Sequence, residues 1–178
     1  MEFLDIVDEQ GNPTGEQRER SEVHARGLRH RTSHVWIMRR KNEKLEILLQ
    51  KRALEKESFP GCYDISSAGH IPAGSGFLES AIRELQEELG ICAKESELIF
   101  CGQRAFFTET EFHGKPFVDR QISNVYLLWK DVEVSDLRIQ KEELESVCWM
   151  EYETCLYLVK NNLFSHSIVL EELEMLKI

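Results

Sequence analysis

Three glutamates, Glu84, Glu87 and Glu88, have the type and spacing that suggest chemistry. Spacings of three and four place Glu84 beside both of the others on a helix surface, where like charges destabilise an isolated helix by a few tenths of a kcal/mol per pair. Such an acidic stripe is most often a solvated helix face. The alternative is a site for a hard cation, because Mg²⁺ prefers oxygen ligands and is commonly held by a few carboxylates together with substrate phosphates.

The element that must position these carboxylates is a helix predicted over Phe77 to Leu89. Its apolar residues recur at spacings of four, three and four, and form one stripe that faces a core: Leu78, Ile82, Leu85 and Leu89. We expect all three glutamates to lie outside this stripe. Gly90 is placed to end the helix as a left-handed cap, and Gly69 lets the preceding loop approach the carboxylates.

The stretch from Gly69 to Ile91 resembles the signature of the Nudix family, which is a glycine, five residues, a glutamate, seven residues and Arg-Glu-aliphatic-x-Glu-Glu-x-Gly-aliphatic. Gly69 and the REL-x-EE-x-GI segment that starts at Arg83 match in register. The first glutamate of the signature falls on Ser75. We expect Ser75 to cap the helix start and Glu79 to supply the salt bridge to Arg83 that this glutamate would have made.

The resemblance implies an α/β fold, an α/β/α sandwich around a mixed β-sheet. It also implies cleavage of a diphosphate linkage by metal-activated water, with Mg²⁺ or Mn²⁺ as cofactor and a small-molecule diphosphate as substrate. Glu84, Glu87 and Glu88 would be the metal ligands, and Arg83 would orient a glutamate. Bound metals neutralise phosphate oxygens and lower the pKa of a coordinated water.

Other segments, in order up to about Trp129, are similar to type I isopentenyl-diphosphate isomerase: FLDIVDEQGNPTG, HARGLRHRTSHVWIM, LLQKRALEKESFPGCYDISSAGH and VYLLW. That enzyme has the same fold but transfers protons on an allylic diphosphate. Its catalytic cysteine corresponds to Ala68 and its catalytic glutamate to Gln121, and neither side chain can replace those groups in proton transfer. We therefore favour a hydrolase, with the isomerase as one alternative and a noncatalytic diphosphate-sensing module as another.

Two further correspondences follow from the isomerase resemblance. Arg52 and Lys56 match the basic pair that holds the diphosphate, a role suited to an arginine fork and a lysine charge, although both residues are equally consistent with surface charges. Three histidines and one acidic residue match a second metal site: His24, His30, His70 and Asp119. Its other acidic position is Gln121, so we expect an impaired site, one whose imidazoles favour a transition metal over Mg²⁺. Structural histidines held by hydrogen bonds are the alternative.

The general base stays open between two groups of acidic residues. Glu142 and Glu143 precede the last predicted strand, where loops of this family bring an additional glutamate to the site, although they equally suit a solvated turn. Glu109, Glu111 and Asp119 lie in a predicted long loop between two strands.

Many strands interleaved with few helices indicate a sheet covered by helices, and without a linker or repeat we expect one domain over residues 1–178. Strands are predicted at Phe3 to Val7, His34 to Met38, Leu45 to Gln50, Tyr63 to Ser67, Leu98 to Phe107, Ile122 to Trp129 and Val147 to Met150. Besides the central helix, helices are predicted at Glu153 to Lys160 and Ser167 to Lys177. The apolar stripe of the last helix suits packing on the sheet, with a homodimer interface as the open alternative.

Composition excludes several function classes. The net charge of −10 disfavours binding to a nucleic-acid backbone, which needs clustered Lys and Arg. No apolar run approaches the roughly 20 residues that span a bilayer, and the amino terminus lacks the pattern of a secretory signal. We expect a cytoplasmic protein that acts on a small molecule and associates with no membrane.

Overall fold

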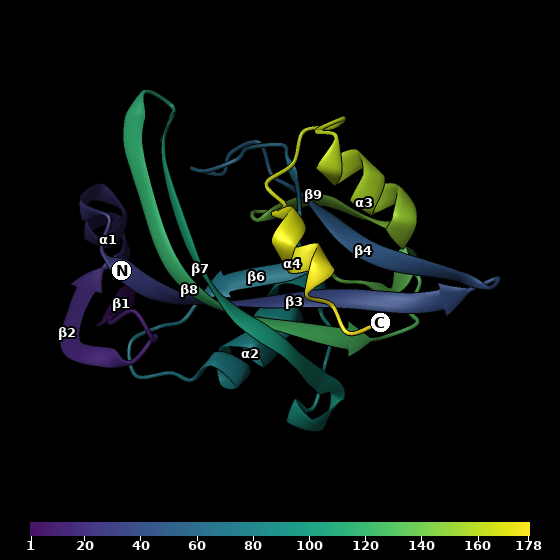
Figure 1. Ribbon diagram of the computed structural model, residues 1–178, viewed down its shortest axis with the longest axis horizontal. Coiled ribbons are helices and arrows are strands. Elements are labelled where there is room, and N and C mark those ends of the chain that lie inside the picture. The colour runs from purple at the N-terminus through teal and green to yellow at the C-terminus, as the bar shows by residue number, and fades with distance from the viewer.

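A mixed sheet of seven strands forms the centre of the protein, described over residues 1–178 in a computed structural model (Figure 1). The sheet strands are β3 (Arg29–Lys41), β4 (Lys44–Arg52), β5 (Tyr63–Asp64), β6 (Ser67–His70), β7 (Leu98–Phe112), β8 (Lys115–Trp129) and β9 (Leu144–Glu151). Five of them follow the order β5-β4-β3-β8-β7, while β6 also pairs with β3 and β9 with β4. The β3–β8 pair is parallel and the others are antiparallel, which makes the sheet mixed.

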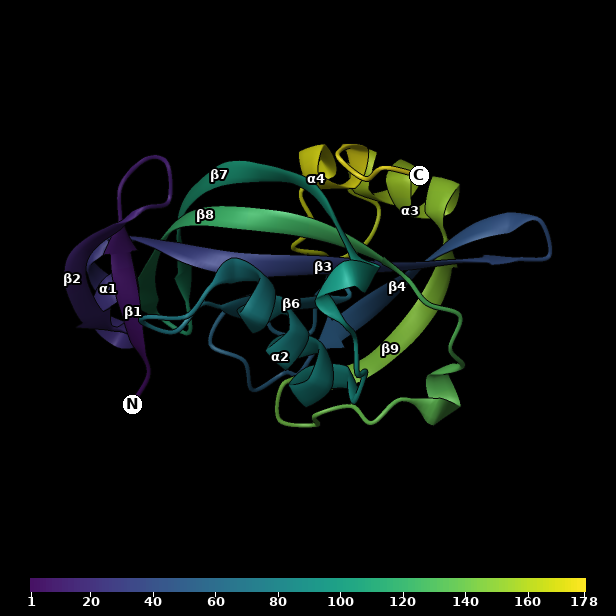
Figure 2. The ribbon, with the colours of Figure 1, turned by 90° about the horizontal axis from the view of Figure 1, so that it is seen from below.

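Helices cover both faces of this sheet, as the sequence predicts (Figure 2). Alternate residues of β3 point to opposite faces, so Val35 and Ile37 pack with helix α2 (Phe77–Leu89). Trp36 and Met38 pack on the other face with residues of α3 (Tyr152–Lys160) and of the segment around α4 (Leu170–Glu174). The protein is therefore an α/β/α sandwich with two hydrophobic cores, one on each side of the sheet.

Helix α2 has the predicted bounds and the predicted cap. Gly90 adopts a left-handed conformation with φ of 70°. Its N–H donates to the carbonyl of Gln86, and the N–H of Ile91 donates to the carbonyl of Leu85. The expectation that all three glutamates lie outside the buried stripe is wrong for Glu88, which is only 6% exposed. Glu88 continues the row of the buried residues Ala81 and Leu85 at spacings of four and three, so its side chain faces the sheet.

The long loop predicted between Phe107 and Ile122 is wrong, because β7 and β8 form a continuous hairpin with a turn at His113 and Gly114. This hairpin arches away from the sheet (Figure 1). The ring of Phe112 lies 4.8 Å, centroid to centroid, from that of Phe59, and Nε2 of His113 is 3.1 Å from the carbonyl oxygen of Lys56. The hairpin tip therefore contacts the loop that follows β4.

Two amino-terminal elements were not predicted. Strand β2 (Pro13–Glu19) pairs with the predicted β1 (Phe3–Val7) in a separate two-stranded sheet, and α1 (Arg20–Arg26) follows it. Most of β2 is exposed, so its sequence lacks the apolar alternation that indicates a strand. Two short 3₁₀ turns, η1 (Glu95–Glu97) and η2 (Val134–Asp136), complete the elements.

The carboxyl-terminal helix is shorter than predicted. Only Leu170–Glu174 is helical within the predicted range Ser167 to Lys177. Leu173 and Leu176 are buried in the core shared with α3, so its apolar stripe packs within the chain. No helix of the protein has the length and apolar character needed to cross a membrane.

Candidate active site

Arg83, Glu84 and the loop before α2 form one connected unit. Nη2 of Arg83 donates to Oε1 of Glu84 at 2.6 Å and to the carbonyl oxygen of His70 at 3.3 Å. Arg83 thus contacts a glutamate of its own helix and ties that helix to β6. A Cβ at Gly69 would overlap the carboxyl group of Glu84, so only glycine lets the strand approach this side chain.

The electrostatic environment differs among the three α2 glutamates. Burial raises the pKa of Glu88 to about 8, and the charge of Glu84 adds to that rise. Burial also raises the pKa of Glu84, although Arg83 opposes the rise. The side chain of Glu87 is 55% exposed, and its Oε2 lies 3.8 Å from Nε of Arg83. A cation bound here would favour the carboxylate forms, and an all-oxygen donor set suits a hard cation.

The roles expected for Ser75 and Glu79 are wrong. Gly76 is the N-cap of α2, and the carboxylate of Glu79 accepts a hydrogen bond from the N–H of Gly76 at 3.3 Å. Glu79 forms no salt bridge with Arg83, whose acidic partners are Glu84 and Glu87. The carbonyl of Ser75 accepts a hydrogen bond from Arg31 instead. Glu84 therefore provides the acidic contact that the sequence assigned to Glu79.

Arg52 is engaged within the fold. Its guanidinium donates to the carbonyl of Ser58 at 2.9 and 3.0 Å and to Oδ2 of Asp64 at 3.2 Å. These bonds hold the loop between β4 and β5.

Lys56, in the same loop, forms an ion pair with Glu143. The charge of Glu143 also raises the pKa of Glu88, although less than burial and the charge of Glu84 do. The Lys56–Glu143 pair is therefore within electrostatic range of the α2 carboxylates. Glu109 and Glu111, by contrast, are exposed along the β7 arm of the hairpin.

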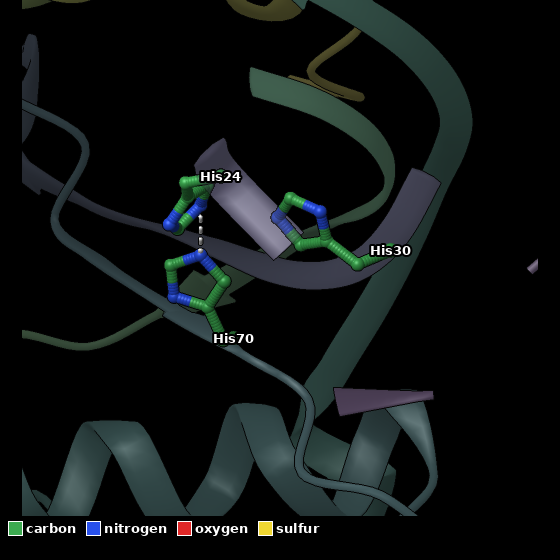
Figure 3. A group of neighbouring side chains, drawn as sticks. All are labelled: His24, His30 and His70. Atoms are coloured by element: carbon green, nitrogen blue, oxygen red, sulfur yellow. Dashed lines mark hydrogen bonds between the residues drawn. The ribbon is translucent and has the colours of Figure 1, made fainter. Parts of the chain in front are cut away.

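The three predicted histidines converge, although they come from α1, β3 and β6 (Figure 3). One nitrogen of each ring of His24, His30 and His70 lies within 4.8 Å of the others, while the α2 carboxylates are not gathered to this extent. Oδ1 of Asp119 is 3.5 Å from Nε2 of His30 and 3.9 Å from Nε2 of His24. The structure thus brings together all four residues that the resemblance assigned to a second metal site.

This cluster fits a metal ion. Nε2 of His30 and Oδ1 of Asp119 are buried and have no hydrogen-bond partner. Burial lowers the pKa of His24 to about 3 and that of His30 to about 4, and it lowers that of His70 as well, so the rings are neutral, as metal ligands must be. Gln121 donates to Oδ2 of Asp119 at 2.5 Å and orients that carboxylate.

Comparison with known proteins shows the family of the chain. The NUDIX domain family matches residues 28–172 of the chain. The chain belongs to the Nudix family. It is 36% identical over 162 residues to an uncharacterized Nudix hydrolase of Clostridium acetobutylicum, an alignment that covers 91% of this chain and 76% of that protein. It is 39% identical over 156 residues to Nudix hydrolase 3 of Arabidopsis thaliana, covering 85% of this chain and 19% of the longer plant protein.

A solved structure has the same Nudix fold. DR0079 from Deinococcus radiodurans superposes with a TM-score of 0.71 at 17% identity, covering 99% of this chain and 100% of that one. The chain is thus a Nudix hydrolase, an enzyme that acts on acid anhydrides, and hydrolysis of a pyrophosphate bond is the reaction typical of its family.

Sequence reasoning missed a polar network in the core of this Nudix fold. Glu172, 1% exposed, accepts hydrogen bonds from Nδ1 of His34 at 2.8 Å, Nε1 of Trp36 at 3.0 Å and Nε of Arg104 at 2.8 Å. Because of these partners, its pKa is lowered to about 2 despite burial. Glu172 and His34 are 138 positions apart, so no spacing signal connects them. The network docks α4 onto the sheet.

Proposed function

We propose that this Nudix hydrolase cleaves the diphosphate linkage of a small molecule, such as a nucleoside diphosphate derivative, with Glu84, Glu87 and Glu88 holding Mg²⁺ or Mn²⁺. When bound, such ions supply charge neutralisation at the phosphate oxygens and a water of lowered pKa. Arg83 keeps the Glu84 carboxylate in place. Residues 1–178 form one domain in this proposal, with β1 and α1 sharing a small core of Leu4, Ile6 and Val23.

The burial of Glu88 is the observation that carries this proposal. Its carboxyl group accepts a weak hydrogen bond from the N–H of Ala68 at 3.4 Å, has the Ser67 hydroxyl nearby, and forms no salt bridge. A buried acid without a cationic partner is costly when ionised. A divalent cation at this position would offset that cost, and a merely solvated helix face would not contain such a residue.

We assign substrate binding and proton transfer to the loops that face α2. Lys56 would bind a phosphate directly, once it has left its ion pair with Glu143. Arg52 would act indirectly, because its hydrogen bonds hold the loop that carries Lys56. Glu143 is our candidate for the general base, because its charge contributes to the raised pKa of Glu88 and because it would be released from its ion pair with Lys56 when Lys56 binds a phosphate.

The histidine cluster is our candidate for a second, transition-metal site. His24, His30 and His70 supply imidazole nitrogens and Asp119 an oxygen, a mixed set that suits zinc, manganese or iron better than Mg²⁺. The unpartnered atoms of His30 and Asp119 support this assignment over purely structural histidines.

We further propose that the chain lies near the isopentenyl-diphosphate isomerases in sequence but does not share their chemistry. Ala68 offers no ionisable group, and Oε1 of Gln121 accepts a hydrogen bond from Thr32 at 3.2 Å, as suits a structural amide. Interconversion of isopentenyl and dimethylallyl diphosphates by the pure protein would overturn this view. Ligand binding without turnover under any metal would instead indicate a sensing module.

The decisive experiment is a screen of nucleoside diphosphates, nucleotide sugars, dinucleotides, prenyl diphosphates and cofactor diphosphates, with and without Mg²⁺ or Mn²⁺, in which the products are identified. Glu87→Gln and Glu88→Gln should reduce turnover by two or more orders of magnitude, while Glu79→Gln, on the exposed side of the same helix, should not. Equal turnover in all three variants would refute the assignment of the metal ligands.

A further inference from the structure

We propose that Arg29, Arg120 and Phe107 form a second ligand site, for a nucleoside phosphate, on the sheet face opposite to the histidine cluster. The three residues are direct cross-strand neighbours, since Arg29 is opposite Arg120 in β3–β8 and Arg120 is opposite Phe107 in β7–β8. Side chains of residues opposite each other share a face, and those of successive residues point to opposite faces. Arg120 therefore points away from the face where Asp119 and Gln121 lie.

These residues line a cavity of about 470 Å³. Ala105, with a small side chain, and Glu9, in the turn between β1 and β2, also line it, together with Phe106 and Gln121. That turn approaches β8 closely, because a Cβ at Gly11 would lie 3.0 Å from Cγ2 of Ile122. The volume is within the range of about 300–1,000 Å³ that is usual for sites of small ligands.

The charge in this cavity is not balanced by the protein. Adjacent strands are only about 4.8 Å apart, and like charges directly opposite each other are destabilising. Neither guanidinium donates a hydrogen bond within the chain, and the one acidic neighbour, Glu9, is 79% exposed with Oε1 3.8 Å from Nη2 of Arg29. Two such arginines in a chain of net charge −10 point to an anionic ligand, and paired guanidinium forks suit a phosphate group.

Phe107 indicates what is attached to the phosphate of the ligand. Phe107 is 55% exposed, and the guanidinium carbon of Arg120 lies 5.3 Å from the centre of its ring. An exposed ring beside a guanidinium is a stacking surface for a planar heterocycle, which the ring and the cation both favour. A phosphate attached to a nucleoside satisfies both the paired arginines and this surface, whereas inorganic phosphate satisfies only the former.

Arg29, Arg120 and Phe107 belong neither to the α2 carboxylates nor to the Lys56–Glu143 pair or the histidine cluster, although Gln121, which also lines the cavity, donates a hydrogen bond to Asp119. The test of this site is therefore binding without metal. Isothermal titration of the full chain with ADP in the presence of EDTA should show binding that Arg120→Gln and Phe107→Leu each weaken at least tenfold. Adenosine and inorganic phosphate should each bind more weakly than ADP.

The chain provides a matched control in Arg40 and Trp129, a second Arg–aromatic pair on β3 and β8, 5.5 Å apart and not part of this cavity. Arg40→Gln should leave ADP affinity within twofold of the parent protein. Equal ADP affinity in Arg120→Gln and Arg40→Gln would overturn the proposal. So would ADP binding that depends on Glu87 or Lys56 but not on Arg120, since the nucleotide would then occupy the catalytic site. Inorganic phosphate binding as tightly as ADP would overturn the assignment of a nucleoside phosphate, since the nucleoside would then add no affinity.

Discussion

The carboxyl group of Glu84 occupies the space that a Cβ on Gly69 would need, since that Cβ would lie 2.2 Å from Cδ of Glu84. The absence of a side chain at Gly69 therefore determines where this carboxylate lies, and Arg83 then holds it from the other side. The glycine and the arginine act on the same glutamate, although they are 14 positions apart in the sequence.

Gly69→Ala should therefore impair catalysis more than stability. The added methyl group would displace the Glu84 carboxylate, and misplacement by about 1 Å costs on the order of 10²-fold in rate. The displaced group is the flexible end of a side chain, so we expect a small change in melting temperature. Turnover at several Mg²⁺ concentrations measures the first effect and thermal unfolding the second. Gly76→Ala is the control, since φ is −91° there and its Cβ would meet open space; equal turnover in both variants would contradict the prediction.

The histidine cluster should retain a transition metal through purification without chelators. We expect roughly one equivalent of zinc, manganese or iron by elemental analysis, because three neutral imidazoles and a carboxylate meet there. His30→Asn should lose this metal. His113→Asn, at the exposed hairpin tip, should keep it. Metal-free parent protein would argue for structural histidines.

Removing the Glu172 carboxylate should be strongly destabilising. Glu172→Ala leaves the buried side chains of His34 and Arg104 without their common anion, and breaking a buried ion pair in this way costs about 3–5 kcal/mol. Urea unfolding monitored by circular dichroism gives this free-energy difference. Glu174→Ala, in the same helix but exposed, should change it by no more than about 0.5 kcal/mol. Similar effects in the two variants would show that the network contributes little.

The contribution of Glu88 to stability without metal should fall as pH rises from about 5 to 8. The pKa of Glu88 is raised from 4.5 to about 8 in the folded chain, so between those values the native state binds more protons than the unfolded state. The free energy of unfolding then decreases with pH, by an amount on the order of a few kcal/mol in total. The buried histidines act in the opposite direction below pH 6.5, but they are common to the parent and to Glu88→Gln.

The difference between these two proteins therefore isolates Glu88. Denaturant unfolding in EDTA at several pH values should show that the free energy of unfolding of the parent, minus that of Glu88→Gln, decreases as pH rises, and added Mg²⁺ should reduce this decrease. Parallel pH profiles for the parent and the variant would mean that Glu88 is not protonated in the folded chain.

Local patterns predicted α2 and its cap because the information lies within 13 consecutive residues and one glycine. Periodicity of apolar residues alone missed the burial of Glu88, since a polar residue that continues the row of Ala81 and Leu85 adds nothing to a hydrophobic stripe. The outer halves of β7 and β8 were missed for a related reason. Glu109, Thr110 and Glu111 are all exposed, and the flanking Thr108 and Phe112 are only partly buried, so the hairpin there lacks the apolar signal of a core strand.

The site residues that belong to a family signature could be predicted from the sequence, and the others could not. The Glu84 unit and the histidine set came from the resemblance, and spacing alone would not have joined His24 to His70 or to Asp119. The Glu172 network and the Arg29–Arg120 pair depend on which strands are neighbours. Pairing of β3 with β8 is a property of the topology, which no local pattern in either strand specifies.

The same parallel pairing has a consequence for folding kinetics. Thr32 and Ser123 meet across it, 2.7 Å apart between hydroxyl oxygens and 91 positions apart in the chain, whereas β3–β4 and β7–β8 are local hairpins. Contacts of large sequence separation require costly loop closure and form slowly. We expect pulsed hydrogen exchange during refolding to protect both hairpins before the amides between β3 and β8. His30 lies on β3 and Asp119 on β8, so the slowest step of folding would complete the histidine cluster.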